Sequence, residues 1–151
     1  MRPVIAEGGC QCGAVRFAFY AAPQCAHACH CRMCQRAVGG AFVLLTGVAK
    51  SDFAWTKGAA KFFASSNLAQ RGFCGDCGTP LSFAYNRPEM RIYATIGSLD
   101  EPAAAPIAQQ VGIESKWPWV SFCEDVPQEE TGASAPADYQ DFIASIKTNQ
   151  A

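Results

Sequence analysis

The order of apolar and polar side chains predicts β-strands along most of this chain. Val15, Phe17 and Phe19 alternate with polar or small residues, which is the period-two pattern of a half-buried strand. A nearly continuous apolar stretch at 41–48 predicts a buried strand. Shorter runs predict further strands at 53–56, 61–64, 81–85, 91–96 and 111–114. Glycine and proline separate these runs at short intervals, which favours antiparallel connections over helical crossovers.

Two segments instead have helical patterns. Residues 32–38 can form two turns, and Gly39 is placed to end them. Near the C-terminus, apolar residues recur at helical spacing and predict a helix at about 136–148 that packs on the domain as a lid. We expect Ser134 to cap this helix and Pro136 to lie in its first turn. The expected fold is therefore mainly β, with small antiparallel sheets and a short C-terminal helix.

Composition narrows the class of protein. The 151 residues are 50% hydrophobic and 17% charged, as in a folded globular chain, and we expect one domain over 1–151 with its core at about 8–127. The net charge is −1 and no basic block occurs, which argues against a nucleic-acid partner. The longest apolar run, 41–49, is too short to cross a membrane. Because no signal sequence is apparent, we expect a cytoplasmic protein.

The cysteines carry the candidate chemistry. Seven of the nine fall into three tight groups: Cys10 and Cys12; Cys29, Cys31 and Cys34; Cys74 and Cys77. In a reducing compartment, clustered thiols are more often metal ligands than disulfides. Glycines flank the first and last groups and allow the tight turns that aim two thiols at one ion.

The first and last groups together match a structural zinc site. A C-x-x-C turn can supply two ligands of a tetrahedral site, and a C-x-C pair elsewhere can supply the other two. We therefore expect Cys10, Cys12, Cys74 and Cys77 to hold one zinc ion that stabilises the fold.

The middle group matches a reactive zinc site. Cys29, Cys31 and Cys34 offer three sulfurs within six residues, and a catalytic zinc needs three protein ligands with a fourth position left for water or a thiol. A zinc ion there would act as a Lewis acid and favour a nucleophilic thiolate that adds to a carbonyl. This interpretation gives two zinc ions per chain.

Other interpretations of the middle group remain open. His30, His27 or Cys25 would complete a purely structural zinc site, and Cys25 with the three clustered cysteines would suit an iron–sulfur cluster. A loosely held zinc would suit metal or redox sensing. A thioredoxin-type role for Cys74 and Cys77 is disfavoured because no βαβ pattern surrounds them.

Three further residues, His30, Cys25 and Cys123, are expected not to bind the metal. Since His30 lies between two ligands, its side chain should point away from their ion, either behind the site or into solvent. Cys25 and Cys123 stand alone and are expected to be buried as small apolar side chains.

Together these residues give the chain a family resemblance. The motifs are Gly-Gly-Cys-Gln-Cys-Gly (8–13), Cys-His-Cys-Arg-Met-Cys-Gln-Arg (29–36), Ser-Ser (65–66), Arg-Gly-Phe-Cys-Gly-Asp-Cys-Gly-Thr-Pro-Leu (71–81), Gly-Ser-Leu-Asp (97–100), Lys-Trp-Pro-Trp (116–119) and Asp-Val-Pro (125–127). With these motifs, the sequence resembles the glutathione-dependent formaldehyde-activating enzyme family, which includes centromere protein V.

The resemblance implies a fold and an activity. It implies antiparallel sheets meeting in a tent-like arrangement, and the same division of the seven cysteines between a structural and a catalytic zinc. The activity it implies joins glutathione to formaldehyde, giving S-hydroxymethylglutathione, which is the reaction of a carbon–sulfur lyase. The alternative is a non-catalytic zinc-binding module that interacts with proteins.

One departure from the family pattern concerns Gln110. The family commonly has a histidine at this place, and glutamine can donate a hydrogen bond but cannot exchange a proton near neutral pH. If that histidine binds or protonates substrate, this chain would act on a different thiol adduct or more slowly.

Substrate contacts are predicted from residue type alone. Arg32, Arg36 and Arg71 are candidates to pair with the carboxylates of an anionic thiol such as glutathione, and each is equally well explained as a surface arginine. Trp117 and Trp119 are candidate walls of a pocket near the metal, although aromatic residues beside a proline are more often core.

Overall fold

The computed structural model of the protein describes residues 1–147. The strands are β1 (Ala6–Gly9), β2 (Arg16–Phe19), β3 (Gln24–Cys29), β4 (Val43–Val48), β5 (Phe53–Lys57), β6 (Lys61–Ala64), β7 (Ala69–Phe73), β8 (Pro80–Tyr85), β9 (Ile92–Thr95), β10 (Gln109–Val111) and β11 (Gln128–Glu129). The helices are α1 (Arg32–Val38) and α2 (Ala137–Ala144).

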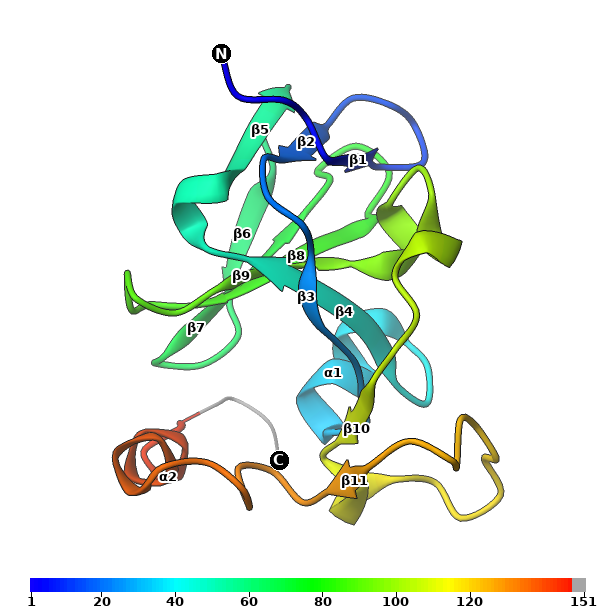
Figure 1. Cartoon of the computed structure of the whole chain (residues 1–151), viewed down its shortest axis with the longest axis vertical. Helices are drawn as coiled ribbons and strands as arrows, with labels where there is room; N and C mark the ends of the chain where they lie inside the picture. Colours follow the sequence, from blue (N-terminus) through cyan, green and yellow to red (C-terminus); the bar gives the residue numbers. More distant parts are fainter. Residues whose placement is uncertain (148–151) are drawn as a thin grey trace.

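The strands form two sheets. One is the antiparallel sheet β1-β2-β5, and the other has the order β11-β10-β3-β4-β9-β8-β7-β6. Within the larger sheet β10 pairs in parallel with both β3 and β11, and the remaining pairs are antiparallel. The small sheet lies at the end of the molecule that holds the N-terminus, whereas α1, β10, β11 and α2 gather at the opposite end (Figure 1). The mainly β class is confirmed.

Most of the predicted strands are present, and the predicted strand at 111–114 is wrong. β10 ends at Val111 because Gly112 takes a left-handed conformation with φ +67°, and a 3₁₀ turn follows at Ile113–Ser115. The sequence predicts no strand at β1, β3, β7 or β11, because these segments are rich in glycine, cysteine and polar residues.

The helices differ in how well the sequence predicts them. α1 has the predicted bounds and ends at Gly39, whose φ of 68° is left-handed and whose N–H donates to Gln35 O. α2 is shorter than the predicted 136–148, of which residue 148 lies outside the described residues. Pro136 stands immediately before α2, and no side chain caps it, so the predicted role of Ser134 is wrong.

Six of the seven clustered cysteines lie in or against hydrophobic clusters. The larger cluster contains the fully buried Phe17, Phe19 and Leu81 together with Cys10 and Cys74. The smaller cluster is formed by Cys34, Val43 and Leu45, and Cys29 and Cys31 pack against it. Close packing holds these side chains in fixed rotamers, so the thiols have fixed positions.

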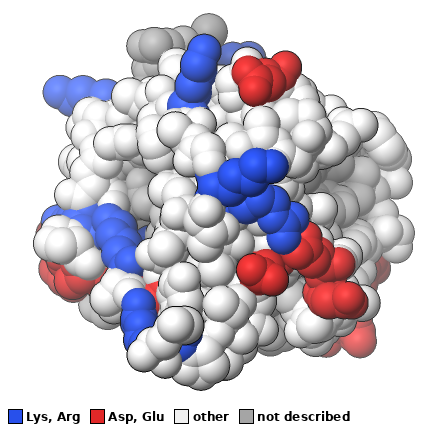
Figure 2. Space-filling view, turned by 90° about the horizontal axis from the view of Figure 1, so that it is seen from above, with Lys and Arg blue, Asp and Glu red and all other residues white. Residues whose placement is uncertain are grey.

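Charged side chains of both signs lie on the face of the molecule shown in Figure 2. On the face shown in Figure 2, small basic groups adjoin acidic ones and uncharged residues cover most of the area. The ion pairs include Arg16 with Asp100 and Arg2 with Asp52, and exposed pairs of this kind contribute about 0–1 kcal/mol each. Neither described helix has the length and apolar character that a bilayer-spanning segment requires.

Candidate metal centres and the adjoining cavity

Four cysteines from two distant turns meet beside the small sheet. Cys10 and Cys12 follow β1, Cys74 and Cys77 lie between β7 and β8, and their four Sγ atoms all lie within 4.8 Å of one another. Cys12 Sγ lies 3.5 Å from Cys10 Sγ and 3.7 Å from Cys74 Sγ. Tetrahedral Zn–S bonds of about 2.3 Å place neighbouring sulfurs about 3.8 Å apart. The four thiols therefore fit a zinc ion.

Local hydrogen bonds hold these two turns in shape. The Val15 N–H donates to Cys10 Sγ over 3.2 Å, and Cys77 Sγ lies 3.1 Å from Thr79 Oγ1. The Thr79 side chain and then its backbone lower the pKa of Cys77 to about 6. Hydrogen bonds that favour the thiolate also favour metal binding, because a metal binds the deprotonated sulfur.

Three further cysteines meet between β3 and α1. Cys29 ends β3, Cys31 is the N-cap of α1, and Cys34 lies in the first turn of that helix. Their sulfurs lie within 4.8 Å of one another, and the Cys34 N–H donates to Cys31 Sγ over 3.4 Å. Among the described residues, no other cysteine, histidine or carboxylate belongs to this group. All nine cysteines lie in the described part of the chain, and none is disulfide-bonded.

The three thiols have unequal affinities for their protons. Hydrogen bonds from Cys29 and Cys31, followed by the charge of Arg71, hold the pKa of Cys34 well below its ordinary value. Hydrogen bonds with Cys31 and Cys34, together with burial, raise the pKa of Cys29 well above its ordinary value. One negative charge is thus favoured at this site, and full ionisation of the trio requires a cation to balance the other two.

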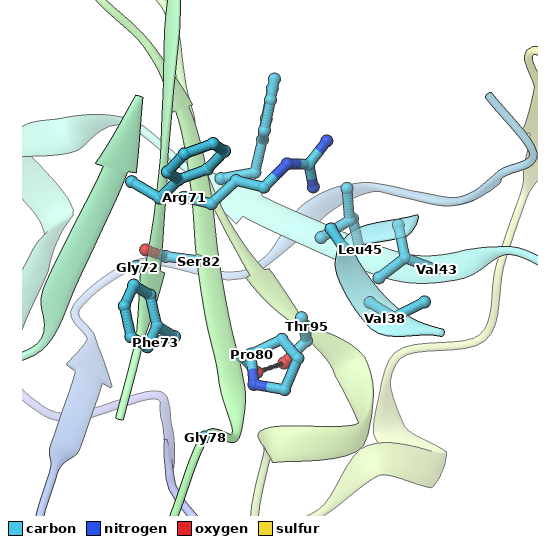
Figure 3. A pocket seen from close by; sticks show the side chains of 13 residues that line it. Val38, Val43, Leu45, Arg71, Gly72, Phe73, Gly78, Pro80, Ser82 and Thr95 are labelled. Atoms are coloured by element: carbon cyan, nitrogen blue, oxygen red, sulfur yellow. Dashed lines mark hydrogen bonds between the residues drawn. The ribbon is translucent and has the colours of Figure 1, made fainter. Parts of the chain in front are cut away.

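Arg71 is the predicted substrate residue that lies closest to the sulfurs. Its Nη2 donates to Cys34 Sγ over 3.4 Å, its Nε donates to Ser65 Oγ over 2.9 Å, and the guanidinium lies over the Phe83 ring. Figure 3 shows Arg71 at the rim of a small hollow of about 170 Å³ between β4 and β8, and Leu45 and Phe83 help to line it. The same three residues line the larger cavity in front of the sulfurs.

His30 points away from the cavity and is fully buried, as the alternation of side chains in an extended segment predicts. Its Nε2 lies 2.6 Å from Gln110 Oε1, and its Nδ1 has no hydrogen-bond partner among the described residues. Because an amide oxygen carries no hydrogen, His30 Nε2 must be the protonated nitrogen. His30 is therefore neither exposed nor a member of the sulfur cluster.

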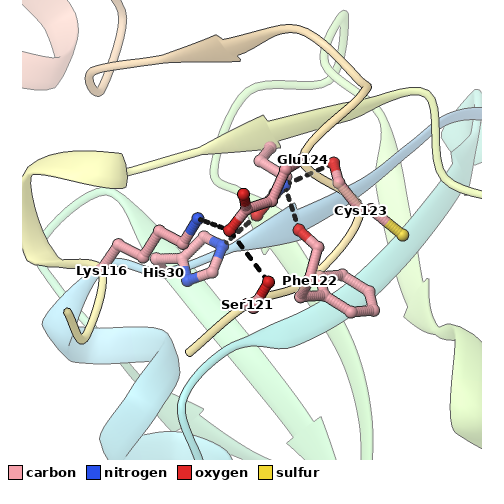
Figure 4. Close-up of polar contacts among 7 residues, drawn as sticks. His30, Lys116, Ser121, Phe122, Cys123 and Glu124 are labelled. Carbon is pink, nitrogen blue, oxygen red and sulfur yellow. Dashed lines mark hydrogen bonds and ion pairs between the residues drawn. The ribbon is translucent and has the colours of Figure 1, made fainter. Parts of the chain in front are cut away.

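Gln110 has a structural position behind the cysteine loop. It is fully buried, and its Nε2 donates to Phe122 O over 2.6 Å and to Cys123 O over 2.8 Å. Figure 4 shows the His30 ring beside the segment that contains these two carbonyls. Gln110 does not line the cavity, although its neighbours Gln109 and Val111 do. Gln110 thus supports the cysteine loop from behind and does not face the cavity.

Backbone contacts clamp the same loop from two sides. The His30 N–H donates to Val111 O over 2.9 Å, and the buried Gln35 donates through Nε2 to His30 O over 2.7 Å. A Cβ on Gly112 would lie 2.8 Å from the backbone nitrogen of Cys31, closer than real Cβ contacts. Glycine at 112 therefore allows β10 to approach the cysteine loop.

A cavity of about 300 Å³ opens in front of the three sulfurs. Its wall carries the rings of Phe83, Tyr85, Tyr93 and Tyr139, and His27 also lines it. Burial raises the pKa of Tyr93 to about 12 and raises that of Tyr85 further, so both phenols stay neutral. The cavity thus joins a cluster of three thiols to a largely apolar wall.

The other predicted residues lie elsewhere. Arg32 is exposed and donates a hydrogen bond to Gln35 Oε1. Trp119 is 76% exposed and does not line this cavity, so the expectation that it forms a pocket wall does not hold here. The prediction that Cys25 and Cys123 are buried is wrong. Both are exposed, with φ of 57° and 43°, and Cys25 lines the cavity at an irregularity in β3.

Several residues of the site were not identified from the sequence. They are the supporting residues Gln35 and Gly112 and the cavity residues Tyr85, Tyr93 and Tyr139. Only Gln35 had a sequence signal, since it follows directly on Cys34 and its amide is one of few polar groups able to satisfy a buried carbonyl.

Comparisons with known proteins agree with the cysteine pattern. A family profile described as "Glutathione-dependent formaldehyde-activating enzyme" matches residues 5–113. An uncharacterised lyase of Schizosaccharomyces pombe is 33% identical over 79 residues, which are 52% of this chain and 57% of that protein. The match thus spans little more than half of the relative. A crystal structure of a Rhodobacter sphaeroides protein has a TM-score of 0.50 and 20% identity, covering 82% of this chain and 99% of that one. This last likeness is one of fold.

The contact at Gly112 yields a prediction with a matched control. Gly112→Ala should lower the free energy of unfolding by about 2–4 kcal/mol, because the new Cβ meets the Cys31 backbone and the left-handed φ adds strain. Gly39→Ala shares that φ but meets nothing within 4 Å, so it should cost only about 1 kcal/mol. Urea unfolding of the two full-length variants measures the difference. Equal losses would mean that Gly112 serves only its own turn.

Proposed function

Since this chain belongs to the glutathione-dependent formaldehyde-activating enzyme family, we propose that it is a zinc-dependent carbon–sulfur lyase acting on a thiol–aldehyde adduct. The proposed substrates resemble glutathione and formaldehyde. The observation that supports this proposal most directly is the trio Cys29, Cys31 and Cys34. It has no further protein ligand in its group among the described residues, and it faces a cavity large enough for a small molecule.

The two sulfur clusters suit two zinc ions with different roles. Cys10, Cys12, Cys74 and Cys77 would saturate one ion, whose contribution is to stability. The trio would hold the other and leave a position toward the cavity. When bound there, zinc supplies Lewis acidity and favours the thiolate form of a substrate thiol near neutral pH.

The chemistry requires no redox step. In adduct formation the sulfur attacks the carbonyl carbon, a C–S bond forms, the C=O electron pair moves to oxygen, and that oxygen takes up the proton that left the thiol. In cleavage the same bond breaks and its electrons return to sulfur. The net reaction therefore needs only correct placement of sulfur and carbon and a route for one proton.

The chain's own residues would place the two reactants. Arg71 bonds Cys34 Sγ through Nη2 and Ser65 through Nε, so its Nη1 is the guanidinium nitrogen placed to pair with a carboxylate of an anionic thiol. The buried His30–Gln110 pair and Gln35 hold the loop that carries the trio, which keeps the sulfurs facing the cavity. Preorganisation of this kind lowers the cost of reaching the reactive geometry.

Serine substitutions separate the two sites. Cys31→Ser should leave a folded protein with about one zinc ion in place of two and without lyase activity, because only the four-sulfur cluster remains complete. Cys74→Ser should lower the free energy of unfolding by at least several kcal/mol, since it breaks a closed four-sulfur site. Metal analysis, urea unfolding and a lyase assay measure these effects.

The control for both substitutions is Cys123→Ser. Cys123 is exposed and lies in neither cluster, so its loss should leave metal content, stability and activity unchanged. If Cys31→Ser unfolded the protein as severely as Cys74→Ser, the middle site would be structural and the lyase proposal would be wrong.

Cobalt substitution separates the lyase from a non-catalytic zinc module. In the cobalt protein, the visible spectrum should change when glutathione is added, because the trio leaves a position that a thiol can occupy. The same titration of cobalt-loaded Cys31→Ser should give no comparable change. A wild-type spectrum indifferent to glutathione would indicate two saturated sites and favour a module that binds protein partners.

A further inference from the structure

The part of the cavity beyond the sulfurs is shaped for an apolar group. Tyr85 and Tyr93 face it from β8 and β9, and Tyr139 and Ile146 face it from the C-terminal segment. The rings of Tyr85 and Phe83 meet edge to face at 5.0 Å, and those of Tyr85 and Tyr139 at 6.3 Å. Such edge-to-face aromatic contacts form an ordered apolar surface.

The cavity offers little to a charged group. Among its described lining residues, Arg71 is the one arginine or lysine, and it already bonds Cys34 and Ser65 beside the sulfurs. Glu129 is the one carboxylate in the lining and would repel a second carboxylate. An anionic group can therefore pair with Arg71, whereas the described residues deeper in the cavity include no arginine or lysine to bind it.

The C-terminal wall is pinned to the rest of the fold. Asn67 Nδ2 donates to Ser145 O over 3.1 Å, and Asn67 Oδ1 accepts from the Lys147 N–H over 2.6 Å. The Thr131 N–H donates to a Glu114 carboxylate oxygen over 3.2 Å. Phe142 of α2 is buried beneath the Arg87 guanidinium. This segment therefore forms a built wall of the cavity, and it lies beyond residues 5–113, which carry the family match.

We infer, on the premise of the proposed lyase function, that the aldehyde part of the substrate carries an aromatic or branched aliphatic group that packs against Tyr85, Tyr93, Tyr139 and Ile146. Formaldehyde contributes a single carbon and would leave the aromatic wall beyond the sulfurs in contact with water. A larger apolar group removes that wall from water, and each added methylene in such a pocket is worth roughly 10-fold or more in specificity. The C-terminal segment thus selects the aldehyde.

The bond changes are those of the proposed reaction with a larger aldehyde. The C–S bond of R–CH(OH)–S–R′ breaks, its electrons remain on sulfur, the hydroxyl proton is transferred to sulfur, and R–CHO leaves. The group R takes no part in the reaction. It contributes through contact with the aromatic wall, so its effect is on kcat/KM for different aldehydes.

The test compares aldehydes of different size and charge with the purified, zinc-loaded full chain. Glutathione is mixed with formaldehyde, phenylacetaldehyde or succinic semialdehyde, and stopped-flow absorbance measures the approach to adduct equilibrium above the uncatalysed rate. We expect kcat/KM for phenylacetaldehyde to exceed that for formaldehyde by about 100-fold. Succinic semialdehyde, which is similarly extended but anionic, should be a poor substrate.

Variants of the C-terminal wall locate the effect. Ala135→Trp fills the cavity and Tyr139→Ala removes one wall, and each should lower the phenylacetaldehyde-to-formaldehyde ratio of kcat/KM at least tenfold. Asp141→Ala, at an exposed position on α2, should leave this ratio unchanged. Thermal unfolding of each variant confirms that it is folded, and Ala135→Trp keeps the test valid if Tyr139→Ala is unstable.

The outcomes distinguish this inference from the proposal on which it rests. Acceleration of formaldehyde equal to or greater than that of phenylacetaldehyde would overturn the inference and leave the lyase intact. Preference for succinic semialdehyde would likewise overturn it. If no aldehyde were accelerated above the uncatalysed rate, the lyase function would be wrong and the inference would fall with it.

Discussion

Mutual repulsion between closely spaced thiolates is the constraint on which this structure depends. Seven sulfurs are held in two clusters whose members lie within 4.8 Å, and six of the seven cysteines lie in or against a hydrophobic cluster. Without a cation, hydrogen bonds among the thiols hold the pKa of Cys34 well below its ordinary value and raise that of Cys29 well above it, and the charge of a neighbouring thiolate adds to the second shift. A divalent ion would balance the negative charges of the thiolates, and its binding free energy would add to the stability of the fold.

The two clusters differ in what surrounds them, and this difference supports different roles. The four-sulfur cluster joins the turn after β1 to the turn between β7 and β8, so it ties together segments more than sixty residues apart. The three-sulfur cluster belongs to one short loop, which is clamped by Gln35, Gly112 and the His30–Gln110 pair and opens on one side to a cavity. These surroundings favour a stabilising role for the four-sulfur cluster and a ligand-binding role for the three-sulfur cluster.

The sequence predicts local features of this molecule well and distant ones poorly. Helix α1 and the cysteine groupings follow from short-range spacing, since capping, turn geometry and ligand proximity act over a few residues. The cavity wall does not follow, because Tyr85, Tyr93 and Tyr139 come from three elements whose meeting depends on sheet order and on where α2 docks. The sequence does not predict the exposure of Cys25 and Cys123 for a related reason. Both residues have a left-handed backbone conformation, which no residue pattern indicates. The role of Gln110 depends likewise on the three hydrogen bonds of its side chain, which join segments far apart in the sequence.

The most direct test of this account is zinc K-edge X-ray absorption of the protein loaded with two equivalents of zinc. Four sulfurs at one ion and three at the other average to 3.5 sulfurs per zinc, with the remainder made up by a light atom from solvent. The account predicts that addition of a thiol raises this average toward four. An average of four sulfurs before any thiol is added, or the scattering pattern of an imidazole ligand, would show that the protein itself closes the second site and would contradict the account.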